Sequence, residues 1–346
     1  MGVGFCLPKD IRDQPGSSRP LYCQEQTCPY SITSSEITSS VTDTSRWVSV
    51  ERCCQLEILL IALKILHTTT YRFNERVSLL PHRVMLRPRE SRELHLISNQ
   101  ITVTPHAGLT RAYDVFGDAI ATATFQMTAS SLVIASVTEL QLYAVAWPVF
   151  DIAVSAMSYP FRYSYDDWIN LGALAVPQFA DTVGALRNWA QMFVRGTQTD
   201  TLSLLKDLSV GVSETIRYQS RDDEGTQTPV ETLNRGWGSC RDFAVLFTEA
   251  ARMLGFGARI VSGYLYNPNQ QSVGSSDAGS THAWAEVFVP GAGWITFDPT
   301  NRSVGGFNLI PVAVARDIRR AIPISGSFVG STGAFAGMSV EVLVTS

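Results

Sequence analysis

The fold is decided by residues 236–254, which read GWGSCRDFAVLFTEAARML. Small residues precede Cys240, and from that cysteine onward apolar side chains recur three and four positions apart. This spacing places the apolar side chains on one face of an amphipathic helix. We expect the helix to end at Leu254, because Gly255 and Gly257 supply a stop signal. The sequence therefore puts a cysteine at the N-terminus of a buried helix.

Cys240 has two interpretations. A helix N-terminus has partial positive charge and unpaired N–H groups, which favour a thiolate over a thiol. The same N–H groups can hold an oxyanion, a contribution of roughly 3 to 4 kcal/mol in acyl transfer. The alternative is a small buried residue without chemistry, since free cysteine is among the most buried residue types. The segment alone leaves both interpretations open, and the choice depends on a base elsewhere in the chain.

A reactive cysteine needs a base, and histidine is the usual one. The sequence has five histidines: His67, His82, His95, His106 and His282. The first four lie in a β-rich region near turns or strand ends, where we expect surface or satisfied structural roles. His282 opens the strand expected at residues 282–289, directly after the polar loop 267–280. His282 is therefore the candidate base, with a polar strand-end residue as the alternative.

Asp298 is the expected partner of His282, since a general base is oriented by a carboxylate or amide on its far nitrogen. A turn at residues 290–293 makes a hairpin that sets Asp298 opposite Ala285 or Glu286. This leaves roughly 10 Å to His282, so we expect a bulge or a register offset to close the gap. Glu286 is the rival orienter, but it lies roughly 13 Å from His282 along the same strand.

The chain divides into three regions by composition and periodicity. With 346 residues it is long enough for two domains. Residues 1–54 are rich in Ser, Thr, Pro and Cys, which is typical of a disordered leader or of a start codon assigned too far upstream. Residues 55–160 hold short strands separated by turn residues, which indicates a β-sandwich-like domain. Residues 161–346 run from helices to an antiparallel sheet, so the whole chain is expected to be α+β.

Within the third region, hydrophobic periodicity gives the expected elements. Helices are expected at residues 182–194 and 201–218, in addition to the helix that begins at Cys240. Strands are expected at residues 258–266, 282–289 and 294–297. The nucleophile-bearing helix is thus followed by a sheet that carries the candidate base and its orienter.

Composition excludes several classes of function. The formal net charge is −4, without a Lys/Arg cluster, which argues against nucleic-acid binding. Five of the six cysteines fall within the first 54 residues, which favours a reducing, cytoplasmic compartment over a disulfide-stapled secreted domain. The apolar run 56–66 is too short to span a bilayer, and the N-terminus lacks the order of a secretory signal, so no membrane partner is expected. Cys23 and Cys28 lack a matching pair at zinc-finger spacing, and we expect no metal and no cofactor.

Three motifs together resemble the transglutaminase-like superfamily, a papain-related group. They are GSCRDFA at residues 238–244, THAWAEV at 281–287 and GWITFDPT at 293–300. The resemblance implies a papain-like core in which Cys240 is the nucleophile, His282 the general base and Asp298 its orienter. It also implies an acyl-thioester route, in which water as acceptor gives hydrolysis and an amine gives transfer.

The resemblance extends to both sides of the core. HTTTY at residues 67–71, LRP at 86–88 and YDVFGD at 113–118 look like the β-domain that precedes the core in bacterial members. The family often has Asn at the position of Asp118. AVARDI at residues 313–318 and a closing strand, MSVEVLV, look like the family's C-terminal segment.

Two functions remain as hypotheses. The first is a cysteine hydrolase or acyltransferase acting on peptide or glutamine/amide bonds of a peptide or protein substrate. The second is a non-catalytic module that keeps the fold and uses its cleft to bind peptides. An acidic loop with calcium-ligand spacing is not found, so calcium-switched behaviour is not expected. The acceptor, the substrate and the oligomeric state are left open by the sequence.

Overall fold

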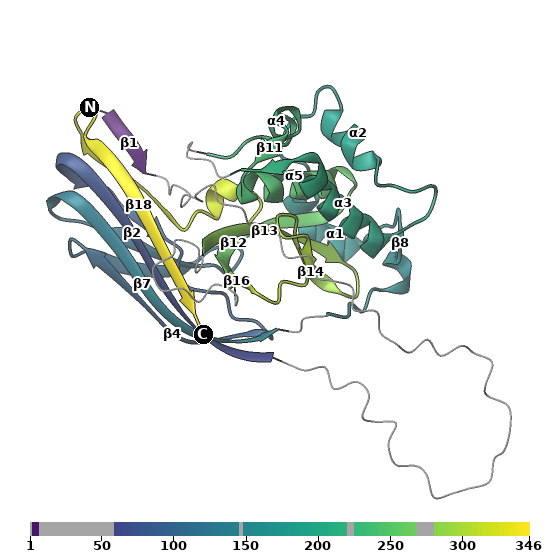
Figure 1. Ribbon diagram of the computed structural model, residues 1–346, viewed down its shortest axis with the longest axis horizontal. Coiled ribbons are helices and arrows are strands. Elements are labelled where there is room, and N and C mark those ends of the chain that lie inside the picture. The colour runs from purple at the N-terminus through teal and green to yellow at the C-terminus, as the bar shows by residue number, and fades with distance from the viewer. Residues whose placement is uncertain (1, 7–58, 145–147, 220–224, 268–279) are drawn as a thin grey trace, which may run out of the picture.

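The computed structural model describes residues 2–6, 59–144, 148–219, 225–267 and 280–346. They form two parts, a strongly curved antiparallel sheet and a mixed core of helices and a second sheet beside it (Figure 1). The α+β class expected from the sequence is confirmed.

The curved sheet has nine strands in the order β4-β7-β2-β17-β3-β6-β5, with β1 added to β17 and β18 added to β2. The strands are β1 (Gly2–Cys6), β2 (Leu59–Leu79), β3 (His82–Val84), β4 (Leu94–Thr104), β5 (Gly108–Tyr113), β6 (Ala119–Thr124), β7 (Thr128–Ala144), β17 (Ile324–Gly330) and β18 (Phe335–Thr345). The long strand β2 buries every second side chain, including Leu63, Ile65, Tyr71 and Phe73, as a strand with one inward face requires.

The N-terminal region is β-rich, but it forms one curled sheet, and two of its strands come from far along the chain. Residues 161–346 were all expected in the core, whereas β17 and β18 of this range pair with β3 and β2. Alternation along a strand reveals its buried face but not its neighbour, so the sequence did not show this crossing. Of the leader expected at residues 1–54, residues 2–6 pair with β17, and the remainder lies outside the described residues.

The core places helices against a five-stranded antiparallel sheet of order β15-β14-β13-β12-β16. Its sheet strands are β12 (Gly257–Leu265), β13 (Ser280–Val289), β14 (Gly293–Asp298), β15 (Ser303–Val304) and β16 (Leu309–Ala315). The helices are α1 (Tyr165–Leu171), α2 (Ala185–Gln191), α3 (Thr201–Thr215), α4 (Pro229–Arg235) and α5 (Cys240–Met253). Short elements complete it: η1 (Val154–Ala156), β8 (Ser158–Tyr159), η2 (Gly172–Ala175), β9 (Thr199–Asp200), β10 (Arg217–Tyr218), β11 (Trp237–Gly238) and η3 (Ile318–Arg320).

Helix α5 is the centre of the core. Its apolar face, with Phe243, Leu246 and Phe247, packs in one cluster with inward-facing residues of β13 and β14 and with leucines of α3. Each such side chain contributes roughly 1.5 to 3 kcal/mol when fully buried. Packing against β13, β14 and α3 therefore fixes the position of the helix that begins with Cys240. Helix α2 is shorter than the range expected from the sequence, since Gly184 before it has a left-handed φ of 72°.

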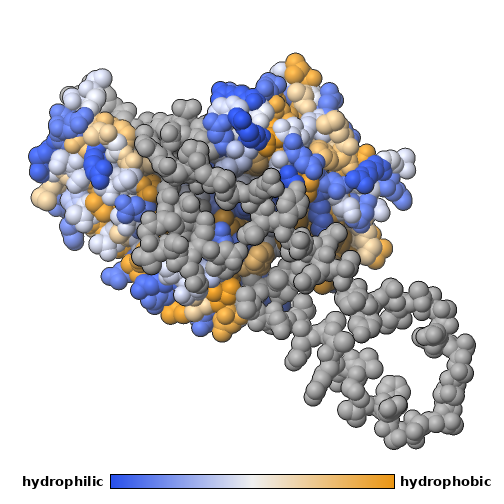
Figure 2. Space-filling view, viewed as in Figure 1, coloured by the Kyte–Doolittle hydropathy of each residue, from blue (hydrophilic) through white to orange (hydrophobic). Residues whose placement is uncertain are grey.

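The curved sheet and the core share a hydrophobic cluster. Leu63, Ile65 and Val344 of the curved sheet pack with Tyr264 and Ile310 of the core. On the face shown in Figure 2, hydrophilic and hydrophobic residues are interspersed over both parts rather than gathered into one apolar surface. The two parts are thus joined through their interiors, and a site at the junction can draw side chains from both.

A buried polar contact adds to this junction. One carboxylate oxygen of Asp118, in the turn before β6, accepts a hydrogen bond from the N–H of Val314 on β16 at 2.9 Å. The other oxygen pairs with Arg89.

Among the described residues, no helix is both long and apolar enough to cross a membrane.

Candidate active site

Cys240 is the first residue of α5, and the structure fixes this helix end with hydrogen bonds. The Asp242 carboxylate, fully buried, accepts from the N–H of Ser239 at 2.8 Å and from its hydroxyl at 3.0 Å. The N–H of Gln227 donates to the other Asp242 oxygen at 2.7 Å. An acidic residue in the first turn also complements the helix dipole. Cys240 therefore begins a helix whose first turn is fixed by hydrogen bonds.

Gly238 is required because the side chain of Asp242 lies close beside it. A Cβ at this position would lie 2.8 Å from the Cβ of Asp242. The small residue thus makes room for the buried carboxylate that locks the helix start.

His282 and Asp298 come together through the hairpin of β13 and β14. The register pairs Ala285 with Phe297, so Asp298 continues opposite Trp284. His282 lies two residues from Trp284 on the same face, which makes His282 and Asp298 diagonal neighbours within side-chain reach. His282 Nε2 and Asp298 Oδ2 are 2.8 Å apart. Of the bulge or register offset expected from the sequence, the paired residues of this hairpin show the register offset, because Asp298 lies opposite Trp284 and not opposite Ala285 or Glu286.

The Asp298 carboxylate accepts hydrogen bonds from the turn that follows it in the chain. Its Oδ1 accepts from the N–H groups of Thr300 at 3.0 Å and Asn301 at 3.3 Å. The side-chain amide of Asn301 donates to Oδ2 at 2.6 Å. Asn301 was not among the expected site residues, since an Asn three positions after a strand end is common in turns. It fixes the carboxylate that orients the base.

Glu286, the rival orienter, is engaged elsewhere. Its carboxylate accepts from Arg259 Nε at 2.6 Å, and the Arg259 guanidinium lies over the Trp294 ring. Glu286 therefore orients Arg259 on the sheet, and Asp298 alone of the two acidic candidates contacts His282.

Cys240 and His282 are buried and line the same cavity. Because Asp298 occupies Nε2, the nitrogen available to the thiol is Nδ1. Burial disfavours the imidazolium, but the charge of Asp298, its hydrogen bond and the nearby Cys240 outweigh burial and raise the pKa of His282 to about 10. Burial also opposes the Asp298 carboxylate, yet His282 and Asn301 stabilise it, and the net effect lowers the pKa of Asp298. His282 is thus paired with Asp298 and lies near Cys240.

A cavity of about 380 Å³ opens beside this array, between the core and the curved sheet. Cys240 and His282 line it from the core, and His67, Thr69 and Val340 line it from β2 and β18. His67 is buried and hydrogen-bonded to Thr69 at 2.9 Å and to the Tyr264 hydroxyl at 3.1 Å. Burial lowers the pKa of His67 to about 4, so it is neutral at neutral pH. Its expected structural role fits these contacts, but its place in the cavity was not foreseen.

The other histidines of the N-terminal region lie away from this cavity. His82 is buried with Nδ1 at 2.7 Å from the Leu80 carbonyl, and the side chains of His95 and His106 are exposed. Among the described residues there is no group of three or more His, Cys, Asp or Glu side chains that could hold a metal ion.

Residues 187–299 match the family model of the transglutaminase-like superfamily, and residues 63–141 match that of the bacterial transglutaminase-like N-terminal region. Cys240, His282 and Asp298 all lie within the first match. The chain belongs to the transglutaminase-like superfamily. The transglutaminase-like core and the β-rich region before it, both expected from the motifs, are thereby confirmed.

Relatives of this transglutaminase-like protein are found in mycobacteria. An uncharacterized protein of Mycobacterium leprae is 33% identical over 113 residues, a match that covers 33% of this chain and 40% of that protein. An uncharacterized protein of Mycobacterium tuberculosis is 26% identical over 301 residues, covering 81% of this chain and 92% of the relative.

Among solved structures, a candidate cysteine protease from Cytophaga hutchinsonii superposes with a TM-score of 0.63 at 19% identity, covering 83% of this chain and 93% of that one. At this identity the likeness shows the fold, including both the curved sheet and the transglutaminase-like core.

Proposed function

We propose that the protein is a cysteine-dependent hydrolase or acyltransferase that acts on peptide or glutamine/amide bonds of a peptide or protein substrate. The observation that carries the proposal is the hydrogen-bonded pair of His282 and Asp298 with Cys240 beside His282 at the wall of one cavity. In this arrangement Cys240 is the nucleophile, His282 the general base next to it, and Asp298 the residue that orients the base, as covalent acyl transfer requires.

In the proposed reaction, the proton of the Cys240 thiol lies on Nδ1 of His282, and the thiolate Sγ attacks the carbonyl carbon of the amide. The raised pKa of His282 favours this proton position. The backbone N–H groups at the start of α5 stabilise the oxyanion of the tetrahedral intermediate. His282 then protonates the leaving nitrogen, the C–N bond breaks, and an acyl-thioester remains on Cys240. Water or an amine attacks the thioester and returns the thiol.

Asp298 has an orienting role in this scheme. Its carboxylate keeps the imidazole turned so that Nδ1 faces the nucleophile, and it stabilises the imidazolium that forms. Asn301 holds the carboxylate in turn at 2.6 Å. No step of the scheme needs a metal or a cofactor.

Mass spectrometry of a glutamine-containing peptide tests the proposal. The peptide is incubated with the wild-type protein, with and without a primary amine, and the products distinguish deamidation, cleavage and transfer. Cys240→Ala is the matched control and should leave the peptide unchanged. Tight peptide binding that survives the loss of both Cys240 and His282, with no product from the wild type, would instead support the peptide-binding module.

For the compartment we propose the cytoplasm, on the basis of the cysteine distribution along the sequence. Fractionation of cells that produce the full chain, with immunodetection in each fraction, tests this. Recovery in a fraction other than the cytoplasm would contradict it.

A further inference from the structure

The nucleophile lies in a small apolar cluster that extends into the cavity. Cys240 packs with Ala283 and Ile318, and the half-buried Phe179 packs against the same cluster. Phe179 and Ile318 both line the cavity next to Cys240. One wall beside the sulfur of Cys240 is therefore apolar. It is built from two segments that are distant in sequence, residues 176–179 and residues 316–319.

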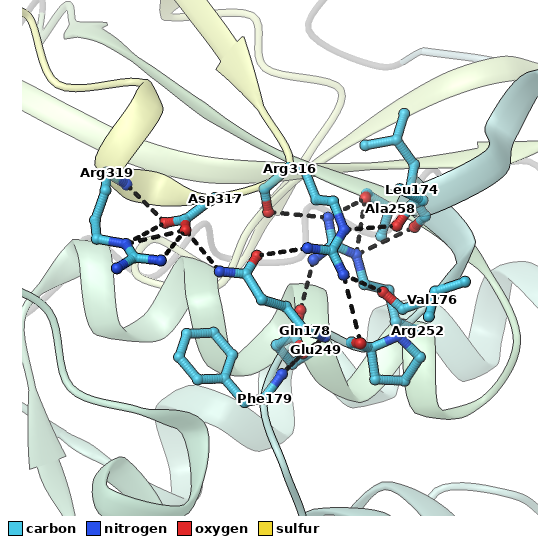
Figure 3. Close-up of polar contacts among 12 residues, drawn as sticks. Leu174, Val176, Gln178, Phe179, Glu249, Arg252, Ala258, Arg316, Asp317 and Arg319 are labelled. Atoms are coloured by element: carbon cyan, nitrogen blue, oxygen red, sulfur yellow. Dashed lines mark hydrogen bonds and ion pairs between the residues drawn. The ribbon is translucent and has the colours of Figure 1, made fainter.

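The residue before each of these apolar side chains makes a polar link between the two segments. Gln178 Nε2 donates to Asp317 Oδ2 at 2.7 Å, across 139 residues of sequence. Because Gln178 precedes Phe179 and Asp317 precedes Ile318, this hydrogen bond, drawn in Figure 3, links the two segments next to the two apolar side chains.

Behind this link, Glu249 of α5 anchors the Phe179 segment. Its Oε2 accepts from the N–H of Gln178 at 2.7 Å and from the N–H of Phe179 at 3.2 Å. Its Oε1 pairs with Arg252 at 2.5 Å, and both side chains are buried. Charged hydrogen bonds in a buried setting are strong and directional. The segment is thus tied to the helix whose first residue is Cys240.

Arginines anchor the other segment in the same network. Arg252 Nη2 donates to the carbonyl of Arg316 at 3.1 Å, and Arg316 Nη1 donates to Gln178 Oε1 at 3.3 Å. Figure 3 shows these side chains converging between α5 and the two segments. Asp317 and Arg319 also line the cavity and pair with each other at 2.5 Å. Phe179 and Ile318 offer apolar surface to a ligand beside this ion pair.

We propose that Phe179 and Ile318 form a subsite for an apolar side chain of the acyl donor, and that Gln178 and Asp317 are positioning residues that hold this subsite beside Cys240. The proposal rests on the proposed function, because it assigns a binding preference to the same nucleophile. The acyl donor is accordingly a peptide or amide with an apolar group close to the reacting carbonyl.

Alkylation of Cys240 by three related reagents tests the subsite without turnover. The reagents are iodoacetamide, N-benzyliodoacetamide and N-(carboxymethyl)iodoacetamide. In each reaction Sγ forms a bond to the methylene carbon and iodide leaves. Each rate is divided by the rate with free cysteine. We expect the wild type to prefer the benzyl reagent over iodoacetamide by about tenfold, and the charged reagent to react more slowly than either.

Variants separate binding from positioning. Phe179→Ala should remove the preference for the benzyl reagent, so that the ratio of its rates with the benzyl reagent and with iodoacetamide falls to the ratio measured with free cysteine. Gln178→Ala should raise the benzyl concentration needed for half-maximal rate and leave the limiting rate unchanged, a split that a general loss of structure would not give. Val176→Ala is the matched control, since this exposed side chain lies on the same segment outside the cavity lining and only its carbonyl joins the network.

The alkylation rates distinguish failure of the subsite from failure of the proposed function. If iodoacetamide labels Cys240 no faster than it labels free cysteine, the proposed function is in doubt. If iodoacetamide labels Cys240 rapidly but the wild type shows no preference for the benzyl reagent, the subsite is overturned. Retention of the preference in Phe179→Ala would overturn it equally, and thermal unfolding of each variant shows whether the fold is intact.

Discussion

The two sides of the cavity are built in different ways. On the core side, Cys240, His282 and Asp298 come from α5, β13 and β14, which all lie within residues 240–298. On the sheet side, His67 and Val340 come from β2 and β18, which pair with each other from far apart in sequence. The candidate triad is thus specified by a short part of the chain, whereas the shape of the space around it depends on long-range pairing. Substitutions on the two sides should accordingly affect different measurements.

The largest effect is expected from Cys240→Ala. Removing the nucleophile should lower the rate of product formation by about four orders of magnitude or more, because base and orienter cannot act without it. The fold should persist, since the substitution removes one small side chain. Product formation by mass spectrometry and thermal unfolding measure the two. Residual turnover close to that of the wild type would place the chemistry away from the core side.

Asp298→Asn should have the next largest effect. The amide cannot hold the imidazolium as the carboxylate does, and a loss of about a hundredfold to ten-thousandfold in kcat is expected. KM should change much less, because Asp298 is buried behind His282. Steady-state kinetics on the peptide identified by mass spectrometry measure both constants. Arg195→Ala, which breaks an exposed ion pair with Asp207, is the control and should match the wild type.

The ion pair between His282 and Asp298 makes the stability of the folded protein depend on pH. Between the unfolded pKa of 6.5 and the native pKa of about 10, the folded protein holds a proton on His282 that the unfolded chain has released. The free energy of unfolding should therefore fall with rising pH in this window, by about 1.4 kcal/mol per pH unit for one proton. Urea unfolding at a series of pH values measures the slope. In Asp298→Asn the contribution of His282 to that slope should disappear, since burial alone lowers the pKa of a histidine.

The smallest effect is expected from Tyr264→Phe, which concerns the sheet side. The change removes the hydroxyl that contacts His67 and should lower the free energy of unfolding by about 1 to 2 kcal/mol. The rate of Cys240 alkylation by iodoacetamide should stay within about twofold of the wild type. A large loss of alkylation would show that the sheet side controls the nucleophile directly and would end the distinction between the two sides.

Much of the core was accessible from the sequence. Periodicity predicted α5 and α3 with their starts at Cys240 and Thr201, and the three motifs brought the candidate triad together. The hairpin of β13 and β14 was also predicted, and of the two ways expected to close the gap to His282, the register offset is the one found. A shift of one residue decides whether two side chains are diagonal neighbours or lie on opposite faces.

Other features were missed for physical reasons. Helix α4 is only two turns long, too short for a periodicity signal, although its capping box of Thr228 and Glu231 with Pro229 could have revealed it. Asn301 acts through a turn whose residues are common in any loop. The partners of β17 and β18, and with them the position of Val340 at the cavity, depend on pairing that alternation does not specify.

The pairing of β18 with β2 has a consequence for synthesis on the ribosome. Lys64 and Thr345 meet across 281 residues, so β2 leaves the ribosome long before this partner exists. The helices and the small sheet can assemble during that interval, with Cys240 already at the start of α5. The cavity cannot form until β17 and β18 have joined the curved sheet, because Ile324 and Val340 line it. A nascent chain therefore carries Cys240 before the cavity beside it is complete.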